Sequence, residues 1–248
     1  MSKVIKKFFW KIYALWCGIM FTSWMTLFGL PGIVPYFFGR KYGAVSFFFF
    51  KVWCTGFSWT TGVLFKMIGQ ENVSKGHSQI FVSNHTSFLD ALAIVIGSPK
   101  YYIPLGKKEL LKVPVLGAVF NNAAVLVDRK NEESRRESVQ RLRNTLDDGI
   151  SIFIFPEGTQ NRTEELLTPF YDGAFRIALE TQRPIQPMII INAGKLMPPN
   201  KFSIRPGTVK VVYGKEYDIS GKKLEDLKEV KEEVRLQMLE MLEKHQPS

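Results

Sequence analysis

Residues 79–96 read QIFVSNHTSFLDALAIVI, and this stretch indicates the class of fold. A short run of apolar, strand-favouring residues at Gln79–Ser83 is followed by a polar turn and then by an apolar helical segment at Phe88–Ile96. A strand that leads through a turn into a helix is the repeating element of α/β layer folds. The stretch therefore predicts an α/β protein.

The same alternation continues along the chain beyond residue 75. Further strands are predicted at Tyr101–Pro104, Ala123–Val127, Ile150–Phe155, Ile185–Ile191 and Val209–Tyr213. Further helices are predicted at Glu132–Leu146, Gly173–Thr181 and Leu224–Glu243. We expect these elements to form a mixed, mostly parallel central sheet flanked by helices.

The first 70 residues differ from the remainder in charge and in aromatic content. They hold eight basic residues and no acidic one, and all five tryptophans of the chain lie there. The other 178 residues carry 25 basic and 23 acidic residues, so most of the net charge of +10 belongs to the N-terminal segment. Tryptophans beside lysines in an apolar segment are typical of a membrane interface, whereas nucleic-acid-binding proteins spread basic residues over a folded face. We expect membrane phospholipids, and no nucleic acid, among the partners.

Two apolar stretches lie in this segment. Ile12–Leu30 is uncharged and as a helix would be about 28 Å long, close to one hydrocarbon thickness, before Gly29–Pro35 breaks it. Tyr42–Phe65 is also apolar but carries Lys51 near its middle. A lysine at mid-bilayer costs about 2.5–3.5 kcal/mol, which favours a hairpin that dips into one leaflet, with Lys51 near the headgroups, over one that crosses the bilayer. A pair of buried core helices in a soluble protein is a third interpretation.

The chain is accordingly expected to comprise an N-terminal two-helix membrane anchor at residues 1–70 and an α/β domain at residues 71–248. Both interpretations of the hairpin keep the basic N-terminus and the α/β domain on one side of the membrane. The positive-inside rule makes that side cytoplasmic, so we expect the protein at the cytoplasmic face of the inner membrane.

The turn in the opening stretch contains a histidine and an aspartate five positions apart, in the order Asn84-His85-x4-Asp90. On one continuous helix five positions correspond to about 140°, so the two side chains could not meet. If Ser87 caps the helix, His85 precedes the helix and Asp90 lies in its first turn. The carboxylate could then accept a hydrogen bond from Nδ1–H and leave Nε2 free as a general base. A structural or merely exposed histidine is the competing interpretation.

The sequence shows no familiar protein nucleophile to accompany this pair. It has no Gly-x-Ser-x-Gly motif, both cysteines lie in the apolar N-terminal segment, and three histidines are too few for a histidine-rich zinc site. A His–Asp pair without a protein nucleophile suits deprotonation of a substrate hydroxyl, which then attacks a thioester directly. We expect neither a metal nor a resident cofactor.

Two further groups of polar residues accompany predicted strand ends. In Phe155-Pro156-Glu157-Gly158-Thr159 a carboxylate and a glycine could hold a polar ligand, although an ordinary turn can have the same composition. Four cations could bind phosphate or could simply be solvated: Lys107, Lys108, Arg129 and Lys130.

Taken together, these motifs resemble the ordered blocks of the glycerolipid acyltransferases, in particular those of bacterial lysophosphatidic acid acyltransferases. The blocks are Asn84-His85-x4-Asp90, Gly117 through Val127-Asp128-Arg129, Phe155-Pro156-Glu157-Gly158-Thr159 and Pro184-Ile185-Gln186-Pro187, and Gly106-Lys107-Lys108-Glu109-Leu110 is also similar. The resemblance covers about residues 75–215. It departs from the family pattern at Gln160-Asn161-Arg162 and at Gln186, which bears on the acceptor and not on the chemistry.

The resemblance implies transfer of a fatty acyl group from an acyl thioester, carried by acyl carrier protein or coenzyme A, to the 2-hydroxyl of lysophosphatidic acid, which gives phosphatidic acid. It also implies a role for each matching residue: His85 as base, Asp90 as its orienting partner, Lys107 and Arg129 on the phosphate, Glu157, Gly158 and Thr159 on the acceptor, and Pro187 in the acyl pocket. Alternative acceptors are glycerol-3-phosphate, another lysolipid and an acylated amino-acid lipid. A non-enzymatic lipid-binding protein is the alternative from a different class.

Overall fold

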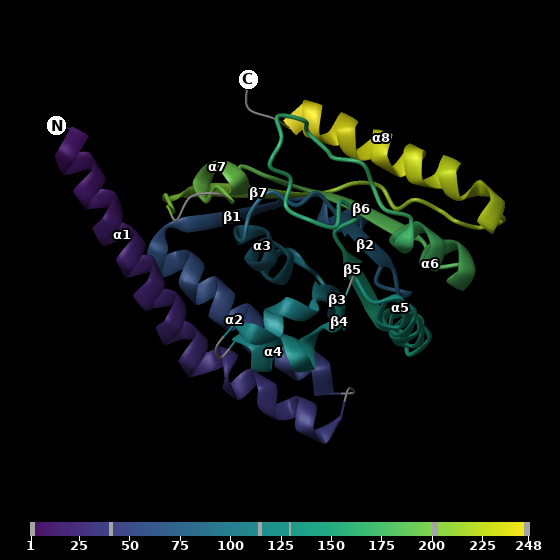
Figure 1. Ribbon diagram of the computed structural model, residues 1–248, viewed down its shortest axis with the longest axis horizontal. Helices are drawn as coiled ribbons and strands as arrows, with labels where there is room; N and C mark the ends of the chain where they lie inside the picture. Colours follow the sequence, from purple (N-terminus) through teal and green to yellow (C-terminus); the bar gives the residue numbers. More distant parts are fainter. Residues whose placement is uncertain (1–2, 40–41, 114–115, 129, 200–202, 246–248) are drawn as a thin grey trace. The chain divides into compact units, whose positions relative to one another are not determined.

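The structure is a computed structural model that describes residues 3–39, 42–113, 116–128, 130–199 and 203–245 (Figure 1). The chain divides into two compact units, each assembled from separate segments. Unit 1 comprises Met1–Met67, Thr86–Ser98 and Ile190–Val211, and unit 2 comprises Ile68–His85, Pro99–Ile189 and Val212–Ser248. The expected division at residue 70 into an anchor and an acyltransferase domain stays a prediction.

Two long apolar helices dominate unit 1. Helix α1 (Lys3–Trp24) and helix α2 (Gly43–Thr61) lie side by side (Figure 1). They are tied together by the Tyr13 hydroxyl, which donates to the Thr61 carbonyl (2.6 Å), and by the Trp24 indole N–H, which donates to Thr60 Oγ1 (3.2 Å). Trp24 fits because the residue opposite it is Gly56, where a β-carbon would lie only 2.4 Å from the indole ring.

The segment that follows α1 is helical over most of Met25–Phe38 but changes its helix type. A π-helical turn at Met25–Gly29 follows α1, and a 3₁₀ helix at Pro31–Phe38 begins after Leu30. The first helix thus ends no later than the predicted break at Gly29–Pro35, but most of that segment forms a new helix. The physical reason is that proline is tolerated at the first turn of a new helix, where its missing N–H would have no partner. The first helix also begins at Lys3 and not at Ile12.

The second apolar stretch is not helical to its predicted end at Phe65. Gly62 adopts a left-handed conformation (φ 70°) that ends α2, and the chain continues as strand β1 (Val63–Ile68). In unit 1, β1 lies next to strand β7 (Gly207–Tyr213). Unit 1 also contains helix α3 (Leu89–Gly97), which packs on α2, and the short helix α7 (Ala193–Leu196), which packs on α3.

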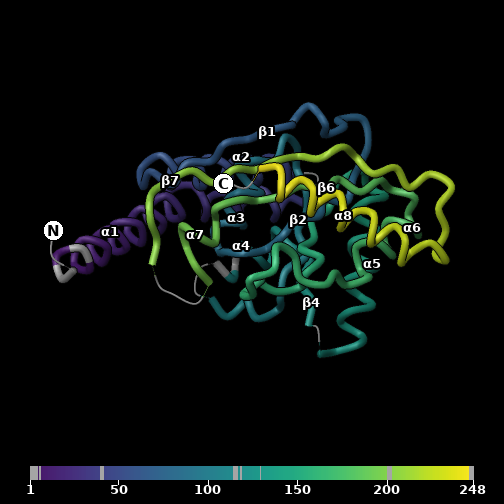
Figure 2. Tube along the Cα trace, turned by 90° about the horizontal axis from the view of Figure 1, so that it is seen from above, coloured from purple at the N-terminus to yellow at the C-terminus, as the bar shows by residue number. Residues whose placement is uncertain are grey.

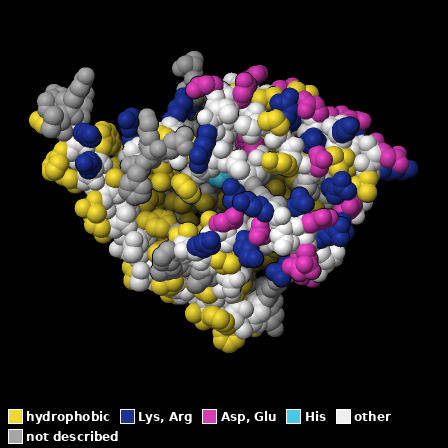
Figure 3. Space-filling model, viewed as in Figure 1, with side chains coloured by type: hydrophobic (Ala, Val, Ile, Leu, Met, Phe, Trp, Pro, Cys, Tyr) yellow, Lys and Arg dark blue, Asp and Glu magenta, His cyan; other side chains and the backbone are white. Residues whose placement is uncertain are grey.

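Much of the apolar surface of α1 and α2 is exposed, and hydrophobic side chains gather over α1 (yellow in Figure 3). The helical segment Lys7–Phe38 is long and apolar enough to cross a membrane, yet only 22% of its most apolar window is buried. A core helix of a soluble protein would bury most of such a window. The exposure therefore favours membrane association over the third interpretation of the sequence.

Unit 2 is built on parallel strands. Its strands are β2 (Ile80–Ser83), β3 (Tyr102–Lys107), β4 (Val125–Val127), β5 (Ser151–Ile154) and β6 (Ile185–Ile191), whose last two residues belong to unit 1. They are neighbours in the order β6-β2-β5-β3-β4, and every pairing is parallel. The register pairs Val82 with Ile154 on one side and with Pro187 on the other. Strands β2, β5 and β6 are buried along their whole length, as expected for parallel strands covered on both faces.

Helices cover these strands. Helix α5 (Glu132–Asp147) packs on β3, β4 and β5, and α6 (Gly173–Thr181) packs on β2. The C-terminal helix α8 (Leu227–His245) lies beside α6 in both views (Figures 1 and 2). Helix α4 (Leu116–Ala123) packs on β3, β4 and the 3₁₀ helix Lys108–Lys112, and two more 3₁₀ turns lie at Gln70–Asn72 and Leu224–Asp226.

The predicted fold class, a mostly parallel α/β sheet flanked by helices with an apolar N-terminal helix, is confirmed. The predicted bounds of β6 and α6 agree with the structure, β2 differs by one residue at its start, and α3 and β5 differ by one residue at each end. Strand β3 continues three residues beyond the predicted Pro104, and the predicted strand Ala123–Val127 loses Ala123 to helix α4. Strand β1 and helices α4 and α7 were not predicted.

Candidate active site

The predicted site residues of unit 2 gather at one edge of its sheet. Because the strands are parallel, their carboxyl ends meet at the same edge, where α/β proteins place their sites. His85 follows β2 by two residues, Glu157 follows β5 by three, and Lys107 is the last residue of β3. The register supports this placement, since Lys107 pairs with Val127, at the end of β4. Residues far apart in the sequence are thus brought together.

His85 is held by the segment that follows β5. Its half-buried ring stacks on the ring of Phe155, with centroids 4.0 Å apart and planes inclined by 15°. Its backbone N–H donates to Glu157 Oε1 (2.8 Å), and its carbonyl accepts from the N–H of Asn161 (2.6 Å). Both the backbone and one face of the imidazole are therefore fixed, while the side chain keeps some exposure to solvent.

Glu157 is buried, with 3% of its surface exposed, and both of its oxygens bind protein donors. Oε1 accepts from His85, and Oε2 accepts from the backbone N–H (2.8 Å) and hydroxyl (2.7 Å) of Thr168. Burial raises the pKa of this carboxyl, and the hydrogen bonds from Thr168 and His85 oppose part of that rise. Glu157 thus links the end of β2 to the loop at Thr168, and its expected contact with the acceptor stays a prediction.

Asp90 lies in the first turn of α3, as predicted, and belongs to unit 1. Its side chain is fully buried. Its Oδ2 accepts hydrogen bonds from the backbone N–H groups of Thr86 (2.6 Å) and Ser87 (2.8 Å). The first of these amides belongs to the peptide bond that joins His85 to Thr86. The carboxylate therefore closes the turn that begins directly after the histidine.

Ser87 does not occupy the cap position predicted for it. Helix α3 begins at Leu89, and Phe88, which has no side chain able to cap, stands in the N-cap position. Ser87 Oγ still accepts from the N–H of Leu89 (3.1 Å) and donates to the carbonyl of Met197 (2.7 Å). The hydroxyl thus stabilises the turn through a contact distant in sequence, which the helix pattern alone could not indicate.

The remaining predicted site residues differ in exposure and in backbone conformation. Gly158 has φ of 71°, a conformation that favours glycine, and its N–H donates to the carbonyl of Phe155 (3.0 Å). Lys107 and Thr159 are exposed, and Pro187 is buried in β6. Arg129 lies outside the described residues. Among the described residues no group of three or more His, Cys, Asp or Glu side chains could hold a metal ion.

Two contributors to the site were missed in the sequence. Phe155 was noted only as part of its motif, and its role as the surface on which His85 stacks depends on β2 and β5 being neighbours. Asn161 stood out only as a departure from the family pattern, yet its backbone binds the His85 carbonyl, and its side chain accepts from the backbone N–H (2.9 Å) and hydroxyl (2.7 Å) of Thr163. Neither of the two contacts with His85 has a local signal in the sequence, because the residues are about 70 positions apart or more.

A parallel sheet with a histidine, a buried glutamate and a lysine at its carboxyl edge defines an α/β protein with a polar site on that edge. The chain belongs to the acyltransferase family: the family model described as Acyltransferase matches residues 64–191. This match includes His85, Asp90, the Phe155–Thr159 motif and Pro187.

Individual relatives support the assignment. The chain is 32% identical over 157 residues to a 1-acyl-sn-glycerol-3-phosphate acyltransferase of Limnanthes douglasii, over 62% of this chain and 55% of that one. It is 33% identical over 144 residues to a protein of the same name from Helicobacter pylori, over 58% and 60% of the two chains. The chain thus spans about half the length of the relatives that it matches.

A solved structure has the same fold. It is the crystal structure of the 1-acyl-sn-glycerophosphate (LPA) acyltransferase, PlsC, from Thermotoga maritima, which aligns with a TM-score of 0.78 over 98% of this chain and 99% of that one. The sequences are 22% identical, so the likeness concerns the fold alone.

Proposed function

We propose that this protein transfers a fatty acyl group from an acyl thioester to the 2-hydroxyl of 1-acyl-sn-glycerol-3-phosphate and so forms phosphatidic acid. The observation that carries the proposal is the fixed position of His85, stacked on Phe155 and bound through its backbone to Glu157, within the segment that matches the family. A histidine held at the carboxyl edge of an α/β sheet suits general-base chemistry on a bound alcohol. The names of the relatives supply the substrate class.

In the proposed mechanism, Nε2 of His85 takes the proton from the substrate hydroxyl as its oxygen attacks the thioester carbonyl. The new C–O bond forms and the C–S bond breaks, so the acyl group leaves the carrier directly for the acceptor. The imidazolium returns its proton to the departing thiolate, and the histidine is regenerated. Asp90 is proposed to orient the base, and a carboxylate that fixes the turn after His85 supports that role.

Cations are proposed to hold the acceptor phosphate. Lys107 lies exposed at the end of β3, on the same edge as His85, and Arg129 is the second candidate from the family pattern. Gly158 and Thr159, with Glu157 beside them, are proposed to line the polar end of the acceptor, and Pro187 the acyl pocket. The acyl donor is proposed to be acyl carrier protein or coenzyme A, with no resident cofactor.

The amphiphilic substrates suit a site beside a membrane. We propose that α1 and α2 attach the protein to the cytoplasmic face of the inner membrane by their exposed apolar side chains. The apolar segment Lys7–Phe38 and the excess of basic over acidic residues before Glu71 support this placement.

The decisive experiment measures release of free thiol from palmitoyl-coenzyme A and from palmitoyl acyl carrier protein, with product identified by mass spectrometry. Lysophosphatidic acid should support thiol release and yield phosphatidic acid, whereas glycerol-3-phosphate and lysophosphatidylethanolamine should support far less. The His85→Ala variant should lose about 10²–10⁴-fold in turnover, the usual contribution of a general base. Normal turnover by this variant, or thiol release with none of the acceptors, would contradict the proposal.

A further inference from the structure

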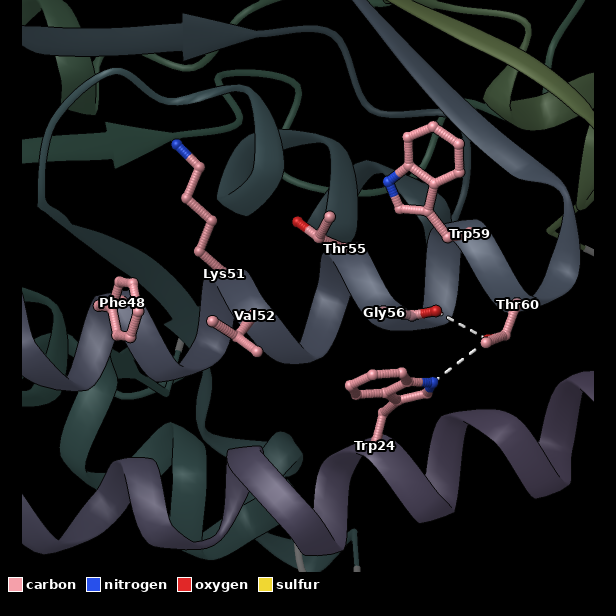
Figure 4. Close-up of a pocket in the computed structure, with 8 residues that line it drawn as sticks. All are labelled: Trp24, Phe48, Lys51, Val52, Thr55, Gly56, Trp59 and Thr60. Carbon is pink, nitrogen blue, oxygen red and sulfur yellow. Dashed lines mark hydrogen bonds between the residues drawn. The ribbon is translucent and has the colours of Figure 1, made fainter.

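Helix α2 carries a single charged side chain, Lys51, and that side chain reaches another helix of unit 1. Figure 4 shows Lys51 on the same face of α2 as Thr55 and Trp59, pointing away from Trp24. Its Nζ donates a 3.0 Å hydrogen bond to the carbonyl of Ser98. Ser98 is the C-cap residue directly after Gly97, the last residue of α3, so the lysine binds the chain at the C-terminal end of that helix.

The charge distribution of unit 1 explains why the lysine binds a carbonyl. The three segments of this unit contain one acidic residue, Asp90. Asp90 lies in the first turn of α3, where the helix dipole is positive, and Lys51 binds the C-cap carbonyl of Ser98, next to the end where the dipole is negative. The nine-residue helix is thus held at both ends by a charge of the favourable sign.

This helix connects Lys51 to the turn that follows His85. A nine-residue helix is about 13 Å long and behaves as a short rigid rod. At its far end Asp90 binds the amides of Thr86 and Ser87. A displacement of α3 relative to α2 would therefore move the Asp90 carboxylate and the first peptide bond after the histidine.

We propose that Lys51 is a positioning residue for acyl transfer: by holding the C-terminal end of α3 against α2, it sets the place of Asp90. The inference rests on the proposed function, because the reaction is what a displaced Asp90 would slow. Lys51 touches no reacting atom. Its effect should appear in kcat and leave KM for the acceptor nearly unchanged.

The test compares Lys51→Met, which keeps the apolar stem without donors, with Lys51→Arg, which restores a cationic donor. The 248-residue chain is assayed in vesicles of phosphatidylethanolamine and phosphatidylglycerol with lysophosphatidic acid as acceptor. Lys51→Met should lower kcat about 10- to 100-fold, the effect expected of a misplacement near 1 Å, with KM changed less than about twofold. Lys51→Arg should recover most of kcat. The matched control is Lys66→Met, an exposed lysine of β1 in the same unit, which should behave as wild type.

A double-variant measurement separates positioning from a merely stabilising role. If Lys51 acts through Asp90, adding Lys51→Met to Asp90→Ala should lower kcat no further, whereas independent effects would multiply. Multiplying effects, a normal kcat in Lys51→Met or failure of Lys51→Arg to recover activity would each overturn the inference.

If Lys51→Met does not fold, Lys51→Gln takes its place in the same comparisons. A wild-type protein that releases no thiol refutes the proposed function, while an active wild type with an equally active Lys51 variant refutes only the role of Lys51.

Discussion

Asp90 Oδ2 accepts a 2.6 Å hydrogen bond from the backbone N–H of Thr86, the residue directly after His85. The spacing of the His-x4-Asp motif therefore places the Asp90 carboxylate, in the first turn of α3, within hydrogen-bonding distance of the peptide N–H that follows the histidine. A negative charge is favourable there because the first amides of a helix are not bonded within it. The aspartate is thus a structural part of the turn as well as the proposed partner of the base.

Replacement of Asp90 separates these two contributions. Asp90→Asn keeps an oxygen that can accept from Thr86, so we expect it to fold nearly as stably as wild type while kcat falls with the loss of the charge. Asp90→Ala leaves the amides of Thr86 and Ser87 without that acceptor, and we expect it to lose about 1–3 kcal/mol more in the free energy of unfolding. Urea unfolding and turnover of both variants test this. Equal unfolding free energies for Asp90→Ala and wild type would contradict it.

The raised pKa of Glu157 predicts a specific dependence of stability on pH. Burial favours the protonated carboxyl in the folded state, so this contribution to stability is complete below the ordinary pKa of 4.5 and is lost as the pH rises through the higher folded pKa. As the pH rises from the ordinary pKa of 4.5 through the higher folded pKa, the free energy of unfolding of wild type should therefore fall relative to that of Glu157→Gln, which cannot titrate. Chemical unfolding at a series of pH values measures the difference. A difference that stays constant, or that grows in favour of wild type as the pH rises, would contradict the assignment.

The stacking of His85 on Phe155 should matter for turnover. Phe155→Leu removes the aromatic surface, worth about 0.5–1.5 kcal/mol for such pairs, and leaves the imidazole free to reorient. We expect kcat to fall about tenfold for an orientational loss of that size, since 1.4 kcal/mol corresponds to tenfold. Phe155→Tyr keeps the ring and is the matched control, expected near wild type. Equal kcat for the leucine and tyrosine variants would show that the stacking does not position the base.

Lys107 should contribute to acceptor binding and not to the chemical step. Because it supplies a point charge at the end of β3, Lys107→Met should raise KM for lysophosphatidic acid about tenfold, with kcat changed less than about twofold. Lys112→Met, a second exposed lysine beyond the same strand, is the control. Steady-state kinetics over a range of acceptor concentrations makes the comparison. An unchanged KM in Lys107→Met would remove this lysine from the phosphate site.

Local sequence patterns determined much of the fold. Continuous apolar runs predicted the buried strands β2, β5 and β6, and helical periodicity predicted α5 and α6, because burial and helix formation are decided by residues a few positions apart. The composition of the apolar, basic N-terminal segment likewise predicted its long apolar helix. The motif residues could be placed near strand ends for the same reason, since a strand that ends in a turn is a local feature.

Only the tertiary structure decided the contacts between residues that are distant in the sequence. Glu157 and His85 are 72 positions apart, and Lys51 and Ser98 are 47 apart, so neither hydrogen bond has a periodicity that a sequence window could detect. The stacking of His85 on Phe155 likewise depends on β2 lying next to β5. Residues 63–65, predicted as the end of an apolar helical stretch, instead belong to strand β1, whose neighbour in the sheet is β7. Strand order is a property of the whole sheet, because each strand is selected by the partners that bury it and not by its own residues alone.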